Sequence, residues 1–122
     1  MIILLDTNIL IEILKGNKSI IERIIPEKQY AISVVCAMEL IYGARDKAEV
    51  IKIKAMLDPL RCYHITDKIS KIALELMQKY SKSHNLAIPD AFIAATAIVE
   101  KLSLFTLNVK DFRYIDALLL SS

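Results

Sequence analysis

The stretch IILLDTNIL, residues 2–10, decides the fold that the sequence predicts. Its first residues are all apolar, as expected of a strand that is covered on both faces of a sheet. Asp6, Thr7 and Asn8 follow directly, and residues of these types end strands and begin helices. A buried strand that leads straight into a helix is the first half of a parallel α/β unit.

The same alternation of short apolar strands and helices continues along the chain. Further strands are expected at 30–33, 62–65 and 103–106, with a candidate fifth strand around 114–115. The expected helices are 8–14, a segment ended by Pro26, 34–42, 45–57, a helix capped by Asp67, and 89–101. This order predicts right-handed crossovers and a three-layer α/β fold, in which helices flank a central parallel sheet of roughly four to five short strands.

Length and composition describe one folded domain, residues 1–122. The chain is 55% hydrophobic and 25% charged, with 2 glycines and 3 prolines, which is typical of a globular domain and not of a disordered chain. A net charge of +2 is too small to argue for a nucleic-acid partner by itself. No stretch is apolar over the roughly 18 residues that a membrane span needs, so we expect a soluble, cytoplasmic protein. Cys36 and Cys62 match no metal or redox motif, and we expect both to be reduced thiols.

A few acidic residues differ from the other acids in their surroundings. Most Asp and Glu residues have a Lys or Arg within about four positions, as expected of pairs on solvated faces. Asp6, Glu39 and Asp90 have none, and all of them lie in apolar sequence. Burying an isolated carboxylate costs about several kcal/mol unless it is paired, protonated or bound to a cation. Each of these acids therefore needs a partner from elsewhere in the fold.

Ordinary structural roles are open for two of these acids. Asp6 could cap a helix, and Asp90, next to Pro89, could favour the positive end of a helix dipole, contributing about 0.5–1 kcal/mol. Glu39 has no such role, because the helical run 34–42 is otherwise apolar.

The predicted topology gives the three carboxylates a place to meet. In parallel α/β sheets, ligands bind beyond the carboxyl ends of the strands, where the helices that carry these acids begin. Carboxylates that converge raise one another's pKa until a cation arrives. Oxygen ligands of this kind suit Mg²⁺ or Mn²⁺, and a carboxylate-bound Mg²⁺ commonly acts on phosphates. Hydrolysis of a phosphodiester bond is the reaction class that we infer.

The segments around these acids resemble those of the PIN-domain ribonucleases, and specifically the VapC-type toxins of toxin–antitoxin pairs. The similar segments are LLDTNILIE at 4–12, ISVVCAMELIYGA at 32–44, PDAFIAATAI at 89–98 and LFTLNVKDF at 104–112. The resemblance implies a PIN-like fold and an endoribonuclease that hydrolyses RNA phosphodiester bonds with Mg²⁺ or Mn²⁺. It also implies that Asp6, Glu39 and Asp90 are the catalytic acids that bind the metal.

The family's fourth acidic position falls at Asn108, where relatives also show Asn. Asn108 can offer an oxygen to metal or water but supplies no charge. The resemblance therefore implies a catalytic site that holds one metal firmly and a second only weakly. Asp111 could compensate for the missing charge, although we favour its pairing with Lys110 or Arg113 on the surface.

Several polar residues are expected to support the site. Those that would orient Asp6, Asn108 or the neighbouring backbone are Thr7, Asn8 and Thr106. They fit roles as turn and cap residues equally well. Glu12, with Lys15 nearby, is a further candidate at the rim of the site.

The resemblance also implies the partners of the chain. These are an RNA substrate, a second copy in a homodimer, and a cognate antitoxin whose C-terminal segment lies across the active-site groove. The high apolar content fits either surface left for partners or a well-filled core. A basic run could line an RNA path or simply be a solvated helix face, and it comprises Arg45, Lys47, Lys52 and Lys54.

Other classes of protein share parts of this pattern. The main alternative is a magnesium-binding, receiver-like phosphoacceptor domain without nuclease activity. Such a domain should have adjacent acids after the first strand and a phosphoacceptor Asp after the third. The acid after the third predicted strand is Asp67, which is expected to cap a helix. A haloacid-dehalogenase-like phosphatase needs an Asp where Asn8 stands. A histidine-based ribonuclease would need His64 and His84 to converge. A pure binding module leaves the unpaired acids unexplained.

Overall fold

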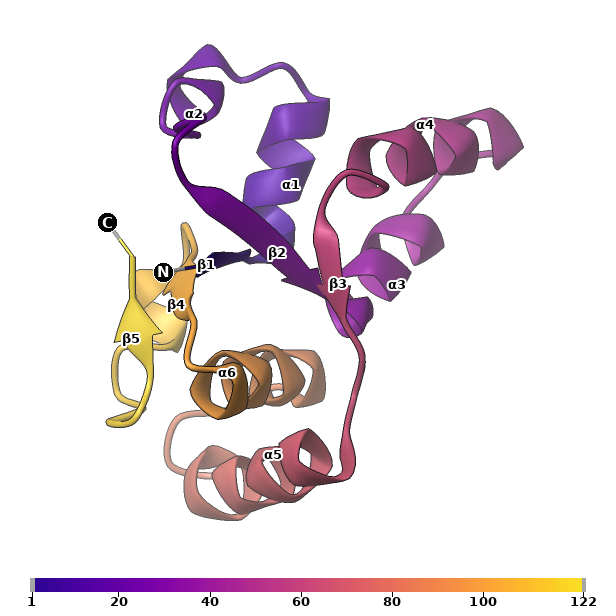
Figure 1. Ribbon diagram of the computed structural model, residues 1–122. Coiled ribbons are helices and arrows are strands. Elements are labelled where there is room, and N and C mark those ends of the chain that lie inside the picture. The colour runs from indigo at the N-terminus through magenta and orange to yellow at the C-terminus, as the bar shows by residue number, and fades with distance from the viewer. Residues whose placement is uncertain (1, 122) are drawn as a thin grey trace.

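The computed structural model describes residues 2–121, which form an α/β structure around one five-stranded sheet. All of its strand pairs are parallel, and the strand order is β3-β2-β1-β4-β5. The strands are β1 (Ile2–Leu5), β2 (Gln29–Ser33), β3 (Arg61–Tyr63), β4 (Ser103–Phe105) and β5 (Leu119–Leu120). Figure 1 shows helices on both sides of this sheet, and the predicted three-layer α/β fold is therefore confirmed.

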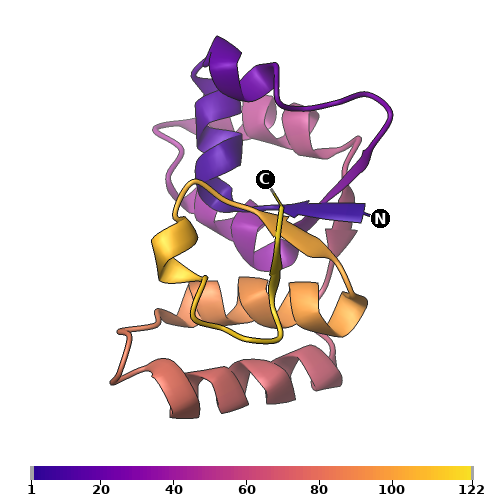
Figure 2. The ribbon, with the colours of Figure 1, turned by 90° about the vertical axis from the view of Figure 1, so that its left-hand side faces the viewer.

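The helices divide between the two faces of the sheet. They are α1 (Thr7–Leu14), α2 (Lys18–Ile21), α3 (Val34–Tyr42), α4 (Lys47–Leu57), α5 (Asp67–Tyr80) and α6 (Ile88–Glu100), with a 3₁₀ turn η1 (Val109–Asp111). Figures 1 and 2 show α5 and α6 on one side of the sheet and α1, α2 and α4 on the other. None of the helices in residues 2–121 is long and apolar enough to cross a membrane.

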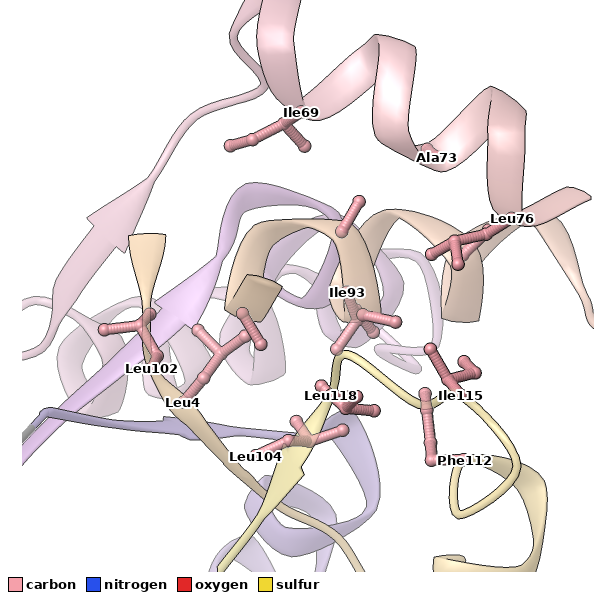
Figure 3. Close-up of a cluster of buried hydrophobic side chains, with 14 of the residues drawn as sticks. Leu4, Ile69, Ala73, Leu76, Ile93, Leu102, Leu104, Phe112, Ile115 and Leu118 are labelled. Carbon is pink, nitrogen blue, oxygen red and sulfur yellow. The ribbon is translucent and has the colours of Figure 1, made fainter. Parts of the chain in front are cut away.

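The strands β1 and β4 supply side chains to two hydrophobic cores, one on each face of the sheet. Leu4 packs in the cluster beneath α5 and α6, whereas Ile3 and Leu5 pack in the cluster with α1–α4. Leu104 and Phe105 of β4 divide between the same two clusters. Neighbouring side chains of a strand point to opposite faces, so a strand covered on both sides, such as β1, is apolar throughout. Figure 3 shows the first cluster, between the sheet and the helices α5 and α6.

The order in which strands are added to the sheet reverses at β1. The strands β2 and β3 are added on one side of β1, and β4 and β5 on the other. The strands β1 and β4 are adjacent, and Leu5 pairs with Phe105 at their carboxyl ends. Such a topological switch point opens a crevice beyond the strand ends, which is the usual place of a ligand in an open α/β sheet.

The predicted fifth strand is wrong in its position. The sequence predicts it around 114–115, whereas the observed strand, Leu119–Leu120, pairs with β4. Ile115 is only 3% exposed and belongs to the cluster beneath α5 and α6. Its apolar character therefore serves the core and not the edge of the sheet.

Several helix boundaries also differ from their predictions, and the helix expected over 45–57, for example, begins at Lys47. The helix expected to continue to Pro26 ends at Ile21, and turns follow it. Thr66, and not Asp67, caps α5, since its hydroxyl oxygen accepts a hydrogen bond from the backbone N–H of Ile69 at 3.2 Å. Asp67 lies in the first turn of α5, where its charge favours the helix dipole.

Candidate active site

Asp6 lies at the switch point and is held by donors from two segments. It follows β1, caps α1 and is only 4% exposed. Its Oδ1 accepts a hydrogen bond from the backbone N–H of Thr7 at 2.8 Å, and its Oδ2 accepts one from the hydroxyl of Thr106 at 2.7 Å. Both donors belong to residues at the ends of packed elements, so the orientation of this carboxylate is fixed. Asp6 is thus a helix cap as well as a candidate ligand.

Thr106 joins the carboxyl ends of β1 and β4. It is buried, and its hydroxyl oxygen accepts hydrogen bonds from the backbone N–H of Asn108 at 2.9 Å and from Nδ2 of Asn8 at 3.4 Å. The Oδ1 of Asn8 in turn accepts a hydrogen bond from the backbone N–H of Leu107 at 3.2 Å. Thr106 and Asn8 therefore tie the segment after β4 to the first turn of α1.

Thr7 connects Asp6 to Glu39. Its backbone N–H bonds to Asp6, and its hydroxyl donates to Oε1 of Glu39 at 2.7 Å. Glu39 itself is exposed, which corrects the expectation that its apolar surroundings bury it. Among its apolar neighbours, Met38 is 62% and Tyr42 is 92% exposed. The physical reason is that α3 buries only one stripe of side chains and turns the rest outward.

Asp90 lies half-buried in the first turn of α6. That helix begins after Ala87 without a side-chain cap, so its first backbone N–H groups favour a nearby negative charge. Burial, followed by the charges of nearby carboxylates, nevertheless raises the pKa of Asp90 to about 6. Those carboxylates belong to Asp6, Glu39 and Asp111. The charges of Asp6 and Glu39 both act on Asp90, and Thr7 links Asp6 to Glu39, so the three predicted acids lie near one another although each belongs to a different helix.

The negative charge of this neighbourhood is not compensated by a basic side chain. The ion pairs formed within residues 2–121 all involve other acids and leave out Asp6, Glu39 and Asp90. Burial raises the pKa of Asp6 as well, although the hydrogen bond from Thr106 opposes this shift. An arrangement of acids without cations costs free energy, which a bound cation would offset.

The carboxylates do not form a closed metal cage. Across residues 2–121, no group of three His, Cys, Asp or Glu side chains converges closely enough to hold a metal ion by itself. The available donors are all oxygen atoms, and Mg²⁺ is usually held through one or two carboxylates while it keeps several waters. The donor set therefore fits an ion of this kind, with water completing its coordination shell.

Asn108 and Asp111 lie next to this neighbourhood. Asn108 is exposed two residues after Thr106, and its side-chain amide takes part in none of the hydrogen bonds found among residues 2–121, whereas its backbone N–H and carbonyl are both engaged. The charge of Asp111 contributes to the raised pKa of Asp90. The ion pair that we favour for Asp111, with Lys110 or Arg113, is not formed in the described part of the chain. Asp111 is therefore nearer to the site than expected.

Glu12 has a different environment from Asp6, Glu39 and Asp90. Its Oε1 accepts a hydrogen bond from Nδ2 of Asn17 at 2.9 Å, and its Oε2 lies 3.5 Å from Nζ of Lys15. The hydrogen bond from Asn17, more than the charge of Lys15, lowers the pKa of Glu12. This carboxylate is already engaged in closing the end of α1.

An aromatic cluster beside the acids is not predicted from the sequence. The rings of His84 and Tyr114 stack with centroids 4.0 Å apart and an interplanar angle of 17°. Tyr80 meets Tyr114 edge-on at 4.9 Å. Burial, followed by the charges of Asp90 and Asp111, raises the pKa of Tyr114, so this ring lies near the acids. The sequence carries no signal for the stack, because its members come from separate segments.

A groove with a volume of about 510 Å³ opens between α1, α3 and α4. Its floor is apolar and includes Ile11, Leu14, Leu40 and Ile53. Charged residues line it as well, namely Lys15, Glu39, Arg45, Glu49 and Lys52. Because Glu39 belongs to both, the groove borders the acidic neighbourhood.

Comparisons with known proteins agree with the resemblance found in the sequence motifs. The PIN domain family model matches residues 3–118. Ribonuclease VapC10 of Mycobacterium tuberculosis is 38% identical over 114 residues, which cover 90% of this chain and 85% of the relative. A toxin–antitoxin complex from Klebsiella pneumoniae has a similar chain, with a TM-score of 0.78, 33% identity, and coverage of 95% of this chain and 94% of that one. VapBC2 from Rickettsia felis, bound to a DNA fragment from its promoter, gives a TM-score of 0.82, 30% identity, and coverage of 99% and 98%.

Proposed function

Because the chain belongs to the PIN-domain family and is similar to VapC ribonucleases, we propose that it is an endoribonuclease that hydrolyses RNA phosphodiester bonds with the help of Mg²⁺ or Mn²⁺. The observation that carries the site is the carboxylate of Asp6, buried at the switch point and hydrogen-bonded on both oxygens. The charges of Asp6 and Glu39 contribute to the raised pKa of Asp90. No basic side chain among residues 2–121 forms an ion pair with these three acids.

Each residue of the site has a separate task. The metal ion would be held by carboxylates from the set Asp6, Glu39 and Asp90, with water completing its coordination shell. Asn108 offers an amide oxygen to the ion or to a water molecule. When bound there, Mg²⁺ or Mn²⁺ would lower the pKa of a water molecule and offset the charge that develops on the phosphate. Thr7, Asn8 and Thr106 are positioning residues that keep the ligand oxygens in place.

A receiver-like phosphoacceptor domain is less well supported. Such a domain needs adjacent acids after the first strand, and here Thr7 and Asn8 follow Asp6. The acid after the third strand, Asp67, is exposed and lies 3.1 Å from Nζ of Lys71. It is engaged in an ordinary ion pair on the surface of α5.

We also infer an antitoxin partner, because the similar chains from Klebsiella pneumoniae and Rickettsia felis come from toxin–antitoxin complexes. The groove between α1, α3 and α4 supports this proposal. Its apolar floor suits an apolar segment of a partner, and Lys15 and Lys52 suit acidic side chains. Since Glu39 lines the groove, a segment bound there would cover part of the active site.

A homodimer and a cytoplasmic location complete the proposal. Exposed apolar side chains on α3, Met38, Ile41 and Tyr42, offer a surface for a second copy. Both cysteines are free, as expected in a reducing compartment. Light scattering of the purified chain tests the dimer.

The proposed activity is tested by incubating the protein with RNA in Mg²⁺ or Mn²⁺ and mapping the product ends. We expect cleavage that EDTA abolishes and that Asp90→Asn lowers by about 100-fold or more, beyond the usual loss from a residue that only orients a ligand. Asp58→Asn is the matched control, since Asp58 is exposed and lies 3.5 Å from Lys54. Cleavage that survives both EDTA and Asp90→Asn would refute the metal site.

A further inference from the structure

The His84 ring is held in a defined orientation by its own loop. Its backbone N–H donates to the carbonyl of Tyr80 at 3.0 Å. Asn85 then adopts a positive φ of 55°, a left-handed conformation that Asn tolerates better than most residues. The Ser83 hydroxyl donates to the carbonyl of Lys79 at 3.3 Å, and its oxygen lies 2.8 Å from Nδ1 of His84. The contact between Ser83 and Nδ1 orients the ring, whichever of the two atoms donates the proton.

The segment that carries Tyr114 is anchored in the core. Phe112 is 1% and Ile115 is 3% exposed, and both pack beneath α5 and α6 (Figure 3). Between and before these anchors, the side chains of Lys110, Asp111 and Arg113 are exposed. The backbone N–H of Arg113 also donates to the carbonyl of Val109 at 2.8 Å. This segment therefore presents polar groups from a rigid support.

A small crevice lies between these two segments. Its volume is about 320 Å³, and it is lined by His84, Lys110, Asp111, Arg113 and Tyr114. Neither of its two basic side chains forms an ion pair with any residue of the range 2–121. The segment begins directly after Asn108, and the charges of Asp90 and Asp111 act on Tyr114. The crevice is thus next to the proposed metal site.

We propose that this crevice binds one nucleotide of the RNA substrate, with the base stacked on the His84 ring and a neighbouring phosphate bound by Lys110 and Arg113. Burial increases from the exposed His84 through the half-buried Tyr114 to Tyr80, which is 8% exposed. The free face of the stack is therefore that of His84. Aromatic rings and paired cations are the usual combination in sites for single-stranded nucleic acid.

The inference rests on the proposed ribonuclease function and specifies the form of its substrate. Only an unpaired base can leave its neighbours and stack on a protein ring, so the site selects single-stranded RNA, loops or ends. An acidic peptide would satisfy the two cations but would gain nothing from the ring stack. The contribution of the base to the binding affinity therefore distinguishes RNA from an acidic peptide as the occupant of the crevice.

The test measures binding in EDTA, where the proposed metal-dependent cleavage stops. The whole protein is titrated into a fluorescein-labelled, single-stranded RNA of mixed sequence, and separately into an abasic oligomer of equal length. We expect His84→Ala to weaken binding of the intact RNA by about 5- to 30-fold and to leave binding of the abasic oligomer almost unchanged. His84→Phe restores a ring and should recover most of the affinity. His64→Ala, at an exposed histidine after β3, is the matched control.

The two cations are tested by their effect on the salt dependence. Replacing both Lys110 and Arg113 by Ala should weaken both probes and reduce the slope of log K against log salt by about 0.7 for each lost phosphate contact. Circular dichroism of each variant confirms that the fold is retained.

The outcomes separate the nucleotide site from the ribonuclease function. If His84→Ala binds intact RNA like the wild type, or weakens both probes equally, the nucleotide site is refuted. If RNA cleavage in that case still depends on Asp90, the proposed ribonuclease function stands without the nucleotide site. If the wild type binds RNA through His84 but cleaves none, the nucleotide site is supported and the proposed function fails.

Discussion

Asp90 makes the stability of the metal-free protein depend on pH. Its pKa of about 6 lies above the ordinary value of 3.8, so the folded state binds more protons than the unfolded state between these values. The contribution of Asp90 to the free energy of unfolding therefore falls as pH rises through this range. Replacing it by Asn removes this contribution.

We expect urea unfolding in EDTA to show this directly. The difference in unfolding free energy, wild type minus Asp90→Asn, should be larger at pH 4 than at pH 7. Comparing the two proteins cancels the other titrating groups that they share. A difference that stays constant or grows with pH would contradict the raised pKa.

Glu39 is predicted to matter for activity but not for folding. Gln can still accept the hydrogen bond from the Thr7 hydroxyl, and the side chain is exposed. Glu39→Gln should therefore change the unfolding free energy by less than about 0.5 kcal/mol and remove most of the RNA cleavage. Thermal unfolding and the cleavage assay are done on the same sample. A destabilised variant with full activity would show that Glu39 is structural.

The two cysteines should differ sharply in reactivity. Burial raises the pKa of Cys36 to about 12, so about one thiol in 10⁴ is ionised at pH 8. Cys62 is exposed on β3. Iodoacetamide should modify Cys62 in the folded protein and reach Cys36 only in urea, as mass spectrometry of the peptides would show. Equal modification of both thiols in the native protein would contradict the burial of Cys36.

At the scale of elements, the Thr106 hydroxyl joins the ends of β1 and β4. Thr106→Val keeps the shape of the side chain but leaves the buried Asp6 Oδ2 and the Asn108 N–H without their partner. We expect a loss of about 1–3 kcal/mol in unfolding free energy and a fall in cleavage. Thr106→Ser retains the hydroxyl and should remain close to the wild type in urea unfolding. Equal losses in both variants would implicate the methyl group instead.

The elements that the sequence predicts correctly have local signals. The apolar run at 2–5 and the 3.6-residue period of α5 are written in neighbouring residues, and both elements form. Strand β5, Leu119–Leu120, ends the apolar run at 117–120, but its bounds are set by its pairing with β4 and not by that run. The exposure of Glu39 is also unpredictable locally, since it depends on how much of α3 the other helices cover.

At the scale of the whole molecule, the parallel topology places the candidate site residues at one edge of the sheet. Parallel strands bring their carboxyl ends to one edge, so acids that follow strands or begin helices can be assigned to it. Asp6 and Thr106, which follow β1 and β4, meet there through a hydrogen bond. The stack of His84 on Tyr114 needed the packed structure, because neither residue has an unusual local sequence. That residues 1–122 form one domain stays a prediction.

The measurement that tests the central claim most directly is the binding of Mn²⁺, followed by electron paramagnetic resonance, in samples whose RNA cleavage is also measured. We predict that wild type and Asp58→Asn bind Mn²⁺ and cleave RNA in parallel as the metal is titrated. Asp90→Asn should lose both, with an unfolding free energy at pH 7 no lower than that of the wild type. Wild-type levels of Mn²⁺ binding and cleavage in Asp90→Asn would contradict a metal site built from the acids at the switch point.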